Sequence, residues 1–273
     1  MMRPITPPAY TGRSASKLQI NVDKRTGALT TLLADGKDIF KQALRLNIMR
    51  YIDNDRKLFP KWTEKYHLDE CQMHVFSWEE RSNGYHIKGY LAAECMAPAA
   101  EFVLDYQVEG NTLTVGVEYK LADYVKNLPR FGFEFGVSNV HSAFSYVGFG
   151  PCESYVDKCV SAHYNYFEST AQKNFEYGYA RPQECGSHYA CTYLAVKNLF
   201  RMTADAPFSC SVLPYTTDQL IETTHVFDLE ENYFVNVCVD LAMRGIGSAS
   251  CGPALDEKYE IPRSGKNTFH FVF

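Results

Sequence analysis

The sequence predicts an all-β fold of antiparallel strands, stacked as two sheets in one domain. Apolar and polar residues alternate with a period of two in many segments, turn residues separate these segments, and helix signals are few. The length of 273 residues fits this prediction, because all-β folds often exceed about 200 residues as a single unit. No convincing domain break follows residue 17, so we expect a leader over residues 1–16 and one domain over 17–273.

The clearest strand pair is a hairpin over residues 102–121. Apolar residues alternate with more polar ones from Phe102 to Val108 and again from Leu113 to Leu121, on either side of the turn Glu109-Gly110-Asn111. A period of two over this length places the apolar residues on one face of an antiparallel pair. The remaining strands are expected at 18–22, 28–33, 84–92, 131–137, 143–148, 189–196, 207–213, 233–240 and 267–273.

Two short helices are expected. Residues 57–67 carry Trp62 and Tyr66 four positions apart, which is a helical spacing. Residues 217–224 follow Thr216, and Gln219 lies three positions after that threonine, as in a capping box.

Composition narrows the classes of function. The net charge is −5 and no basic run occurs, which argues against a nucleic-acid partner. No apolar stretch approaches the ~20 residues of a membrane span. The nine cysteines are scattered without a CxxC pair, so we expect no metal centre and mostly buried, reduced thiols. Aromatic residues make up 14%, which suits sheet faces and also sugar-binding clefts.

The segment GFGPCESYVDK, residues 148–158, is the first candidate for chemistry. Glu153, Tyr155 and Asp157 share one face if this segment is extended. Two carboxylates on one face are suited to acid–base catalysis. The alternative, which we favour, is a structural corner in which Glu153 and Asp157 bind backbone amides or an arginine.

Two further clusters contain ionisable side chains. Arg50 precedes Asp53 and Asp55, whose oxygens suit a hard cation, although Asp and Asn in such runs more often form turns. Glu184 and His188 offer an acid and a base, although a lone pair of this kind is more often structural. The glycine-rich segment 245–253 is typical of a surface loop, because it lacks the Lys-Ser/Thr ending of a phosphate-binding loop.

Taken in order, these clusters resemble the C-terminal, or small-chain, domain of family-two β-galactosidases. Asn47 to Asp55 is similar to the family's N-F-W-R-A-P-T-D-N-D, and Leu128 to Gly132 matches its L-P-R-x-G. Residues 148–158 match G-x-G-P-x-E-N-Y-x-D-R, with Ser154 for Asn and Lys158 for Arg. Residues 181–186 resemble x-P-Q-E-N-G, residues 219–225 a helix ending in T-H, and residues 245–253 the loop G-x-G-x-x-S-x-x-P.

The resemblance implies a β-supersandwich like that of galactose mutarotase, placed after a catalytic barrel. In the family, the catalytic acid/base and nucleophile glutamates of the retaining mechanism lie on that barrel. A barrel takes about 250 residues, so this chain has no room for one beside the sandwich. We therefore expect no catalytic residue and no turnover in this chain alone, and we expect the remaining domains or a large subunit as its partner.

The same resemblance implies a contribution to the rim of the active site. In some members an aromatic residue of the loop matching Ser250 and Cys251 forms part of the aglycone platform, and here the matching residue is Cys251. The implied ligand is a β-galactoside or galactose. No cofactor is expected in this domain, whereas Mg or Na ions belong to other domains of the parent. We expect a cytoplasmic location, and the resemblance leaves a homo-oligomer open.

Two alternatives remain. The first is a stand-alone mutarotase-like enzyme that uses a histidine and a carboxylate, for which the candidates are His163, His188, Glu153 and Glu184. The second is a non-catalytic carbohydrate-binding module, which needs exposed aromatic rings on one face.

Overall fold

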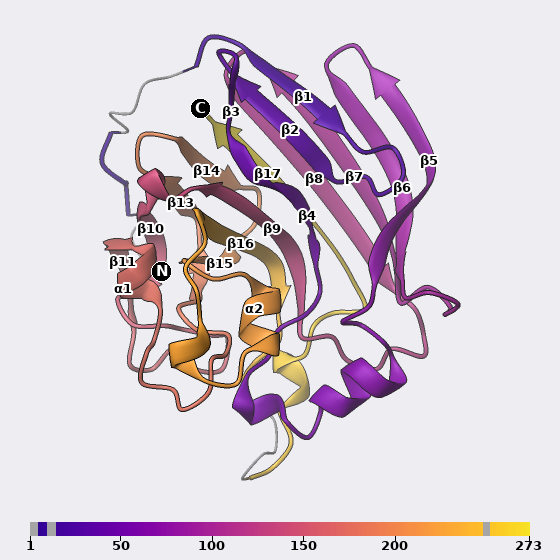
Figure 1. The fold of residues 1–273 in the computed structure, drawn as a ribbon, viewed down its shortest axis with the longest axis vertical. Coiled ribbons are helices and arrows are strands. Elements are labelled where there is room, and N and C mark those ends of the chain that lie inside the picture. The colour runs from indigo at the N-terminus through magenta and orange to yellow at the C-terminus, as the bar shows by residue number, and fades with distance from the viewer. Residues whose placement is uncertain (1–4, 10–14, 248–251) are drawn as a thin grey trace.

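Two antiparallel sheets packed face to face form the molecule (Figure 1). The computed structural model describes residues 5–9, 15–247 and 252–273. The eight-stranded sheet contains, in spatial order, β1 (Leu18–Val22), β2 (Leu29–Ala34), β4 (Phe40–Asn47), β9 (Arg130–Ser138), β16 (Phe234–Met243), β15 (Phe208–Leu213) and β12 (His188–Cys191), with β3 (Lys37–Asp38) beside β2.

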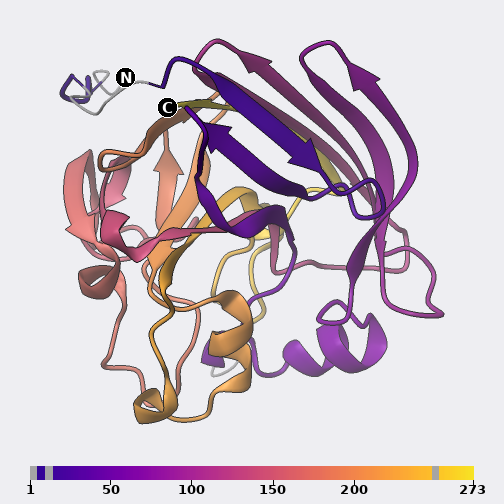
Figure 2. The same ribbon diagram turned by 45° about the horizontal axis from the view of Figure 1, so that its top comes forward.

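The second sheet has nine strands and curves around one side of the first (Figure 2). In spatial order it contains β11 (His163–Thr170), β10 (Ala143–Gly150), β13 (Tyr193–Val196), β14 (Phe200–Ala204), β17 (Ser264–Val272), β8 (Thr112–Leu121), β7 (Ala100–Glu109), β6 (Gly84–Ala92) and β5 (Gln72–Arg81). The all-β, antiparallel supersandwich predicted from the sequence is therefore confirmed.

In the part of the chain that the structure describes, helical structure is confined to short pieces. These are α1 (Ala171–Asn174), α2 (Thr217–Glu222), a π-helical turn (Lys61–Lys65) and 3₁₀ turns at Asp53–Asp55, Asn139–His141, Val226–Asp228 and Glu257–Tyr259. The capping box predicted for α2 is present, because Thr216 Oγ1 accepts the Gln219 amide while Gln219 Oε1 accepts the Thr216 amide. The short helix expected within 57–67 is present, because α-helical residues 59–60 lead into the π-helical turn Lys61–Lys65. Trp62 of this turn is buried, and its indole Nε1 donates to Asn127 Oδ1 at 2.9 Å.

Aromatic side chains fill the space between the sheets. Phe133 and Phe135 of β9 meet Phe269 and Phe271 of β17 edge to face, and Tyr119 of β8 stacks on Phe131 with ring centroids 4.1 Å apart. The hairpin over 102–121 forms as predicted, with Leu104 and Leu113 among its fully buried residues. Each fully buried ring of this kind contributes about 1.5–3 kcal/mol, so this core is the main source of the domain's stability.

One predicted strand turns out to be two. Residues 189–196 were expected to form a single strand, but β12 belongs to the eight-stranded sheet and β13 to the nine-stranded sheet. Ala190 has a positive φ of 53°, and the register of β12 shifts between His188 and Cys191. The chain therefore crosses between sheets where the apolar pattern alone indicates a continuous strand.

Candidate functional site

The face of the eight-stranded sheet that points away from the core is polar. The pairing of β9 with β16 sets Gly132 opposite Asp240 and Glu134 opposite Cys238, in alternation with core-facing pairs such as Phe133 and Val239. Helix α2 covers part of this face, since Glu134 Oε1 accepts the backbone amide of Thr217 at 3.0 Å. The Glu134 carboxylate is therefore removed from solvent and bound to protein partners.

Arg130 occupies the centre of this buried polar face. Its guanidinium donates to both carboxylate oxygens of Asp240, at 2.9 and 2.6 Å, and to Glu184 Oε2 at 2.9 Å. Arg130, Asp240 and Glu184 are each at most 3% exposed. Gly132 makes room for the pair, because a Cβ there would lie 2.4 Å from Asp240 Oδ1.

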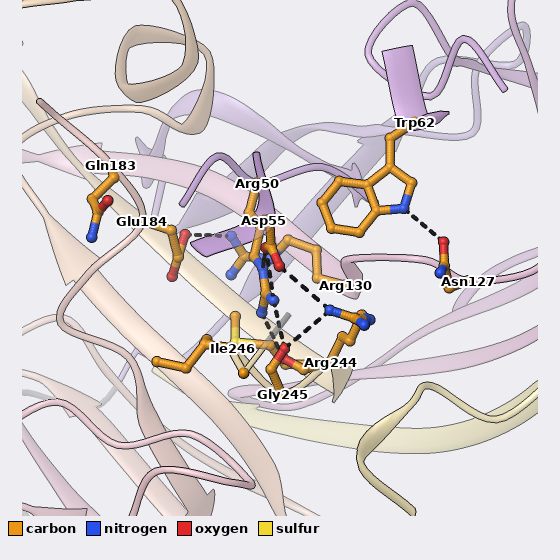
Figure 3. A network of polar contacts seen from close by, with 12 residues as sticks. Arg50, Asp55, Trp62, Asn127, Arg130, Gln183, Glu184, Arg244, Gly245 and Ile246 are labelled. Carbon is orange, nitrogen blue, oxygen red and sulfur yellow. Dashed lines mark hydrogen bonds and ion pairs between the residues drawn. The ribbon is translucent and has the colours of Figure 1, made fainter. Parts of the chain in front are cut away.

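A second ionic group lies beside the first, at the end of the sandwich where the loops gather (Figure 3). Arg50 donates to Asp55 Oδ2 at 3.0 Å and to the carbonyl oxygens of Arg244 and Gly245 at 2.6 and 2.9 Å. Arg244 in turn contacts Asp55 Oδ1 at 3.4 Å and both oxygens of Glu260 at 2.7 Å. Arg244 and Gly245, which directly follow β16, are thus held by buried charge.

Burial and neighbouring charges shift the pKa values of Arg130, Asp240 and Glu184 in opposite directions. Burial disfavours the charge on Arg130, but the fields of Asp240 and Glu184 raise its pKa well above the usual range. Burial also raises the pKa of Asp240 and of Glu184, and the field of Arg130 offsets this only in part. The arginine therefore stays charged, and both carboxylates are held as its partners.

The corner at residues 148–158 is not an extended strand with three side chains on one face. Tyr155 is buried and forms an isolated bridge with Lys158, so the segment turns back on itself. Glu153 accepts hydrogen bonds from Lys158 Nζ at 2.6 Å, Tyr179 Oη at 2.5 Å and the Gly186 amide at 3.2 Å. Glu153 therefore binds a backbone amide, as predicted if residues 148–158 form a structural corner.

Asp157 braces a different segment. Its two carboxylate oxygens accept the backbone amides of Ile246 and Gly247, at 2.9 and 2.8 Å. These residues precede the rim candidates Ser250 and Cys251 by three to five positions, and the candidates themselves lie outside the described residues. Asp157 from one side and Arg50 from the other therefore hold the start of the predicted rim loop.

Glu184 and His188 are not brought together as an acid–base pair. The Glu184 carboxylate binds Arg130, whereas His188 Nε2 lies 2.9 Å from Asn174 Oδ1. The His188 ring stacks on Tyr146 with centroids 3.8 Å apart, and burial lowers its pKa to about 3. A histidine with this pKa is neutral at physiological pH and has a structural environment.

The cation site considered at Asp53 and Asp55 is also not assembled. Asp55 is bound to two arginines, and the Asp53 amide donates to Gln183 Oε1 at 2.9 Å while its side chain is exposed. Across the described ranges, the His, Cys, Asp and Glu side chains form no group of three or more suited to a metal ion. The eight described cysteines are free thiols, and four of them are buried, fewer than expected.

Sequence reasoning did not single out Asp240, Arg244 or Glu260 as part of a site. A signal existed for Glu134, because it is a lone charge within the apolar strand 131–137. The partners of Arg130 could not be read in this way, since Glu184 and Asp240 lie 54 and 110 residues further along the chain.

Comparisons with known proteins agree with this architecture. The family model described as "Beta galactosidase small chain" matches residues 14–273. A β-galactosidase from Actinobacillus pleuropneumoniae is 33% identical over 258 residues, which cover 92% of this chain and 26% of that protein. A β-galactosidase small subunit from Latilactobacillus sakei is 26% identical over 192 residues, which cover 64% of this chain and 59% of that one.

A solved structure shows the same fold at low sequence identity. A protein from Escherichia coli K12 assigned as an aldose 1-epimerase superposes with a TM-score of 0.50 at 8% identity, over 96% of this chain and 97% of that one. The chain spans about a quarter of the length of long relatives such as the Actinobacillus pleuropneumoniae protein. With a family match over nearly its whole length, this chain belongs to the β-galactosidase small-chain family.

Proposed function

We propose that this chain is the C-terminal domain, or the separate small subunit, of a retaining β-galactosidase that hydrolyses terminal β-D-galactosides. Its role is to complete the rim of the active site, while the catalytic glutamates lie on a barrel in another domain or a large subunit. The chain alone does not turn over substrate. The family match and the small share of the long relatives that it covers support this division of labour.

The observation that carries the proposal is that residues 244–247, which we call the rim segment, are anchored by two separate side chains. Asp157 accepts the amides of Ile246 and Gly247, and Arg50 donates to the carbonyls of Arg244 and Gly245. Four consecutive residues are thus held by side chains from two loops that are distant in sequence. Such anchoring supports a segment whose position relative to a partner domain must be fixed.

The buried charges argue against the stand-alone mutarotase alternative. Of the carboxylates on the polar sheet face, Asp240 and Glu184 are bound to Arg130, and Glu134 binds Arg45 as well as the Thr217 amide. A general acid or base needs hydrogen-bond access to substrate. Groups buried in this way and committed to arginines lack that access.

The first test is hydrolysis of o-nitrophenyl β-D-galactoside by the purified chain, alone and together with the remaining domains or large subunit of the parent. We expect no hydrolysis by the chain alone and activity in the complete enzyme. Hydrolysis by the chain alone that is abolished by Glu153→Gln would overturn the proposal, because residues 148–158 would then be an active site.

The second test concerns the anchor. In the complete enzyme, Asp157→Asn removes the charge that holds two backbone amides, so we expect a raised KM with the enzyme still folded. Asp228→Asn is a matched control, because Asp228 is exposed and its carboxylate contacts His225. An unchanged KM in Asp157→Asn would show that anchoring of the rim does not contribute to substrate binding.

A further inference from the structure

A row of aromatic side chains crosses the outer face of the nine-stranded sheet at its β10–β11–β13 end. Phe144 and Tyr146 of β10 point into the core, so Val147 and Phe149 point outward. Tyr164 pairs with Phe149, and Tyr166 and Tyr193 flank Val147 from the two neighbouring strands. We call this row the outer aromatic strip; it consists of Phe149, Tyr164, Tyr166 and Tyr193 of this sheet, together with Tyr189 of β12, which belongs to the other sheet and stacks on Phe149.

The rings of the strip are close enough to form one surface. The centroids of Tyr189 and Phe149 are 6.0 Å apart with nearly parallel planes, and those of Phe149 and Tyr164 are 5.5 Å apart at 77°. Four of the five residues are only partly buried, and Tyr193 is 8% exposed. The strip is therefore a twisted surface and not a flat platform.

A hollow of about 630 Å³ adjoins the Tyr166 and Tyr193 end of the strip, and its size falls in the range of small-molecule sites, about 300–1,000 Å³. Glu168, Lys173 and Lys197 line it together with the hydroxyl of Ser145. The Tyr166 hydroxyl donates to Glu168 Oε1 at 2.8 Å, which fixes the carboxylate at the edge of the ring. The lining of the hollow thus combines two tyrosine rings, those of Tyr166 and Tyr193, with charged and hydroxyl groups.

The start of the chain borders the same hollow. Ile5 packs against the cluster formed by Val147, Tyr193 and Ala195, and Pro8 and Ala9 contribute to the lining. Figure 1 shows β10 and β11 at the edge of the molecule, so the strip lies at the periphery of the sandwich. The described leader residues form a wall of the hollow.

We propose that the outer aromatic strip and its hollow bind an oligosaccharide, as a second carbohydrate site separate from the rim loop. A sugar ring has an apolar C–H face that packs on an aromatic ring and hydroxyl groups at its edge that need polar partners. The strip supplies the rings, and Glu168, Lys173 and Lys197 supply the polar partners. Because neighbouring rings are twisted by 77°, the surface suits a single flexible chain of sugars and not a flat crystalline one.

The site requires no hydrolysis, so it can be tested on the chain alone, whatever the outcome for the proposed enzyme activity. Isothermal titration of the full chain with β-1,4-galactotetraose and with galactose measures both affinity and its dependence on length. We expect millimolar binding of the tetrasaccharide and weaker binding of the monosaccharide, because a strip engages several sugar rings while a single pocket engages one.

Variants locate the binding. Tyr166→Ala removes a ring of the strip, and we expect about tenfold weaker binding of galactotetraose, equivalent to ~1.4 kcal/mol. Lys197→Gln keeps the packing of the strip and should weaken binding by a smaller factor, which guards against a folding defect in Tyr166→Ala. Tyr233→Ala is the control, because Tyr233 is 69% exposed at the start of β16 in the other sheet, and should leave binding unchanged.

Three results would overturn the proposal. The first is the absence of saturable galactotetraose binding by the unaltered chain. The second is equal affinity for galactose and galactotetraose. The third is binding that survives both Tyr166→Ala and Lys197→Gln, or that falls equally in Tyr233→Ala, since the sugar would then lie elsewhere.

Discussion

His188 makes a quantitative prediction about the pH dependence of stability. The ring is buried against Tyr146, and its Nε2 atom faces Asn174 Oδ1. The orientation of the Asn174 amide is set by its Nδ2 donating to the carbonyls of Gly186 and Val212. His188 therefore carries its proton on Nε2, which leaves Nδ1 as a buried acceptor without a hydrogen-bond partner.

The magnitude follows from the difference between the folded and unfolded pKa. Burial lowers the pKa of His188 to about 3 in the folded chain, whereas an unfolded histidine titrates near ~6.5. A depressed folded pKa stabilises the protein above pH ~6.5, and this stability is lost as the pH falls toward 3, because only the unfolded state takes up the proton. Between pH 7 and pH 5 the loss amounts to about 2 kcal/mol.

Urea unfolding at pH 7 and pH 5 measures this loss directly. His188→Gln keeps an N–H donor toward Asn174 but cannot titrate, so its free energy of unfolding should fall about 2 kcal/mol less over this range than that of the unaltered chain. His225→Gln, at an exposed histidine, should behave like the unaltered chain. An equal fall in His188→Gln and the unaltered chain would refute the reasoning.

Three other perturbations follow from the same structure. Arg130→Met leaves the carboxylates of Asp240 and Glu184 buried without their cation. In urea titrations this should lower the free energy of unfolding by about 3–5 kcal/mol. A loss below ~1 kcal/mol would contradict the conclusion that both carboxylates are charged partners of Arg130. Thr216→Ala removes the capping box of α2 and should cost about 1 kcal/mol, seen as a lower midpoint of thermal unfolding. Burial raises the pKa of the Cys191 thiol well above its usual range. Ellman's reagent should therefore modify the exposed Cys95 and Cys152 in the folded chain and Cys191 only after unfolding. Rapid modification of Cys191 in the folded chain would contradict its burial.

The local sequence pattern was enough to predict many of the strands, because the side chains of a half-buried strand point alternately to the core and to solvent. The hairpin over 102–121 and the strand at 131–137 follow from this rule, and so does α2 from its capping box. Strand β5 escaped this rule because most of its residues are exposed, so no apolar period marks it. The same rule gave a wrong prediction for residues 189–196, because both halves of the segment are apolar although they belong to different sheets.

The motifs of the sequence also identified the family, because they occur in the family's order along the chain even where single residues differ. The role of their charged residues was decided only by tertiary structure. Arg130 meets Asp240 because the register of β9 on β16 sets Gly132, which has no side chain, opposite that aspartate. Asp157 meets Ile246 and Gly247 because the folded chain brings two loops together across about ninety residues of sequence. Hydrogen bonds and ion pairs act over a few ångströms in space, and that proximity is a property of the folded sandwich and not of local sequence.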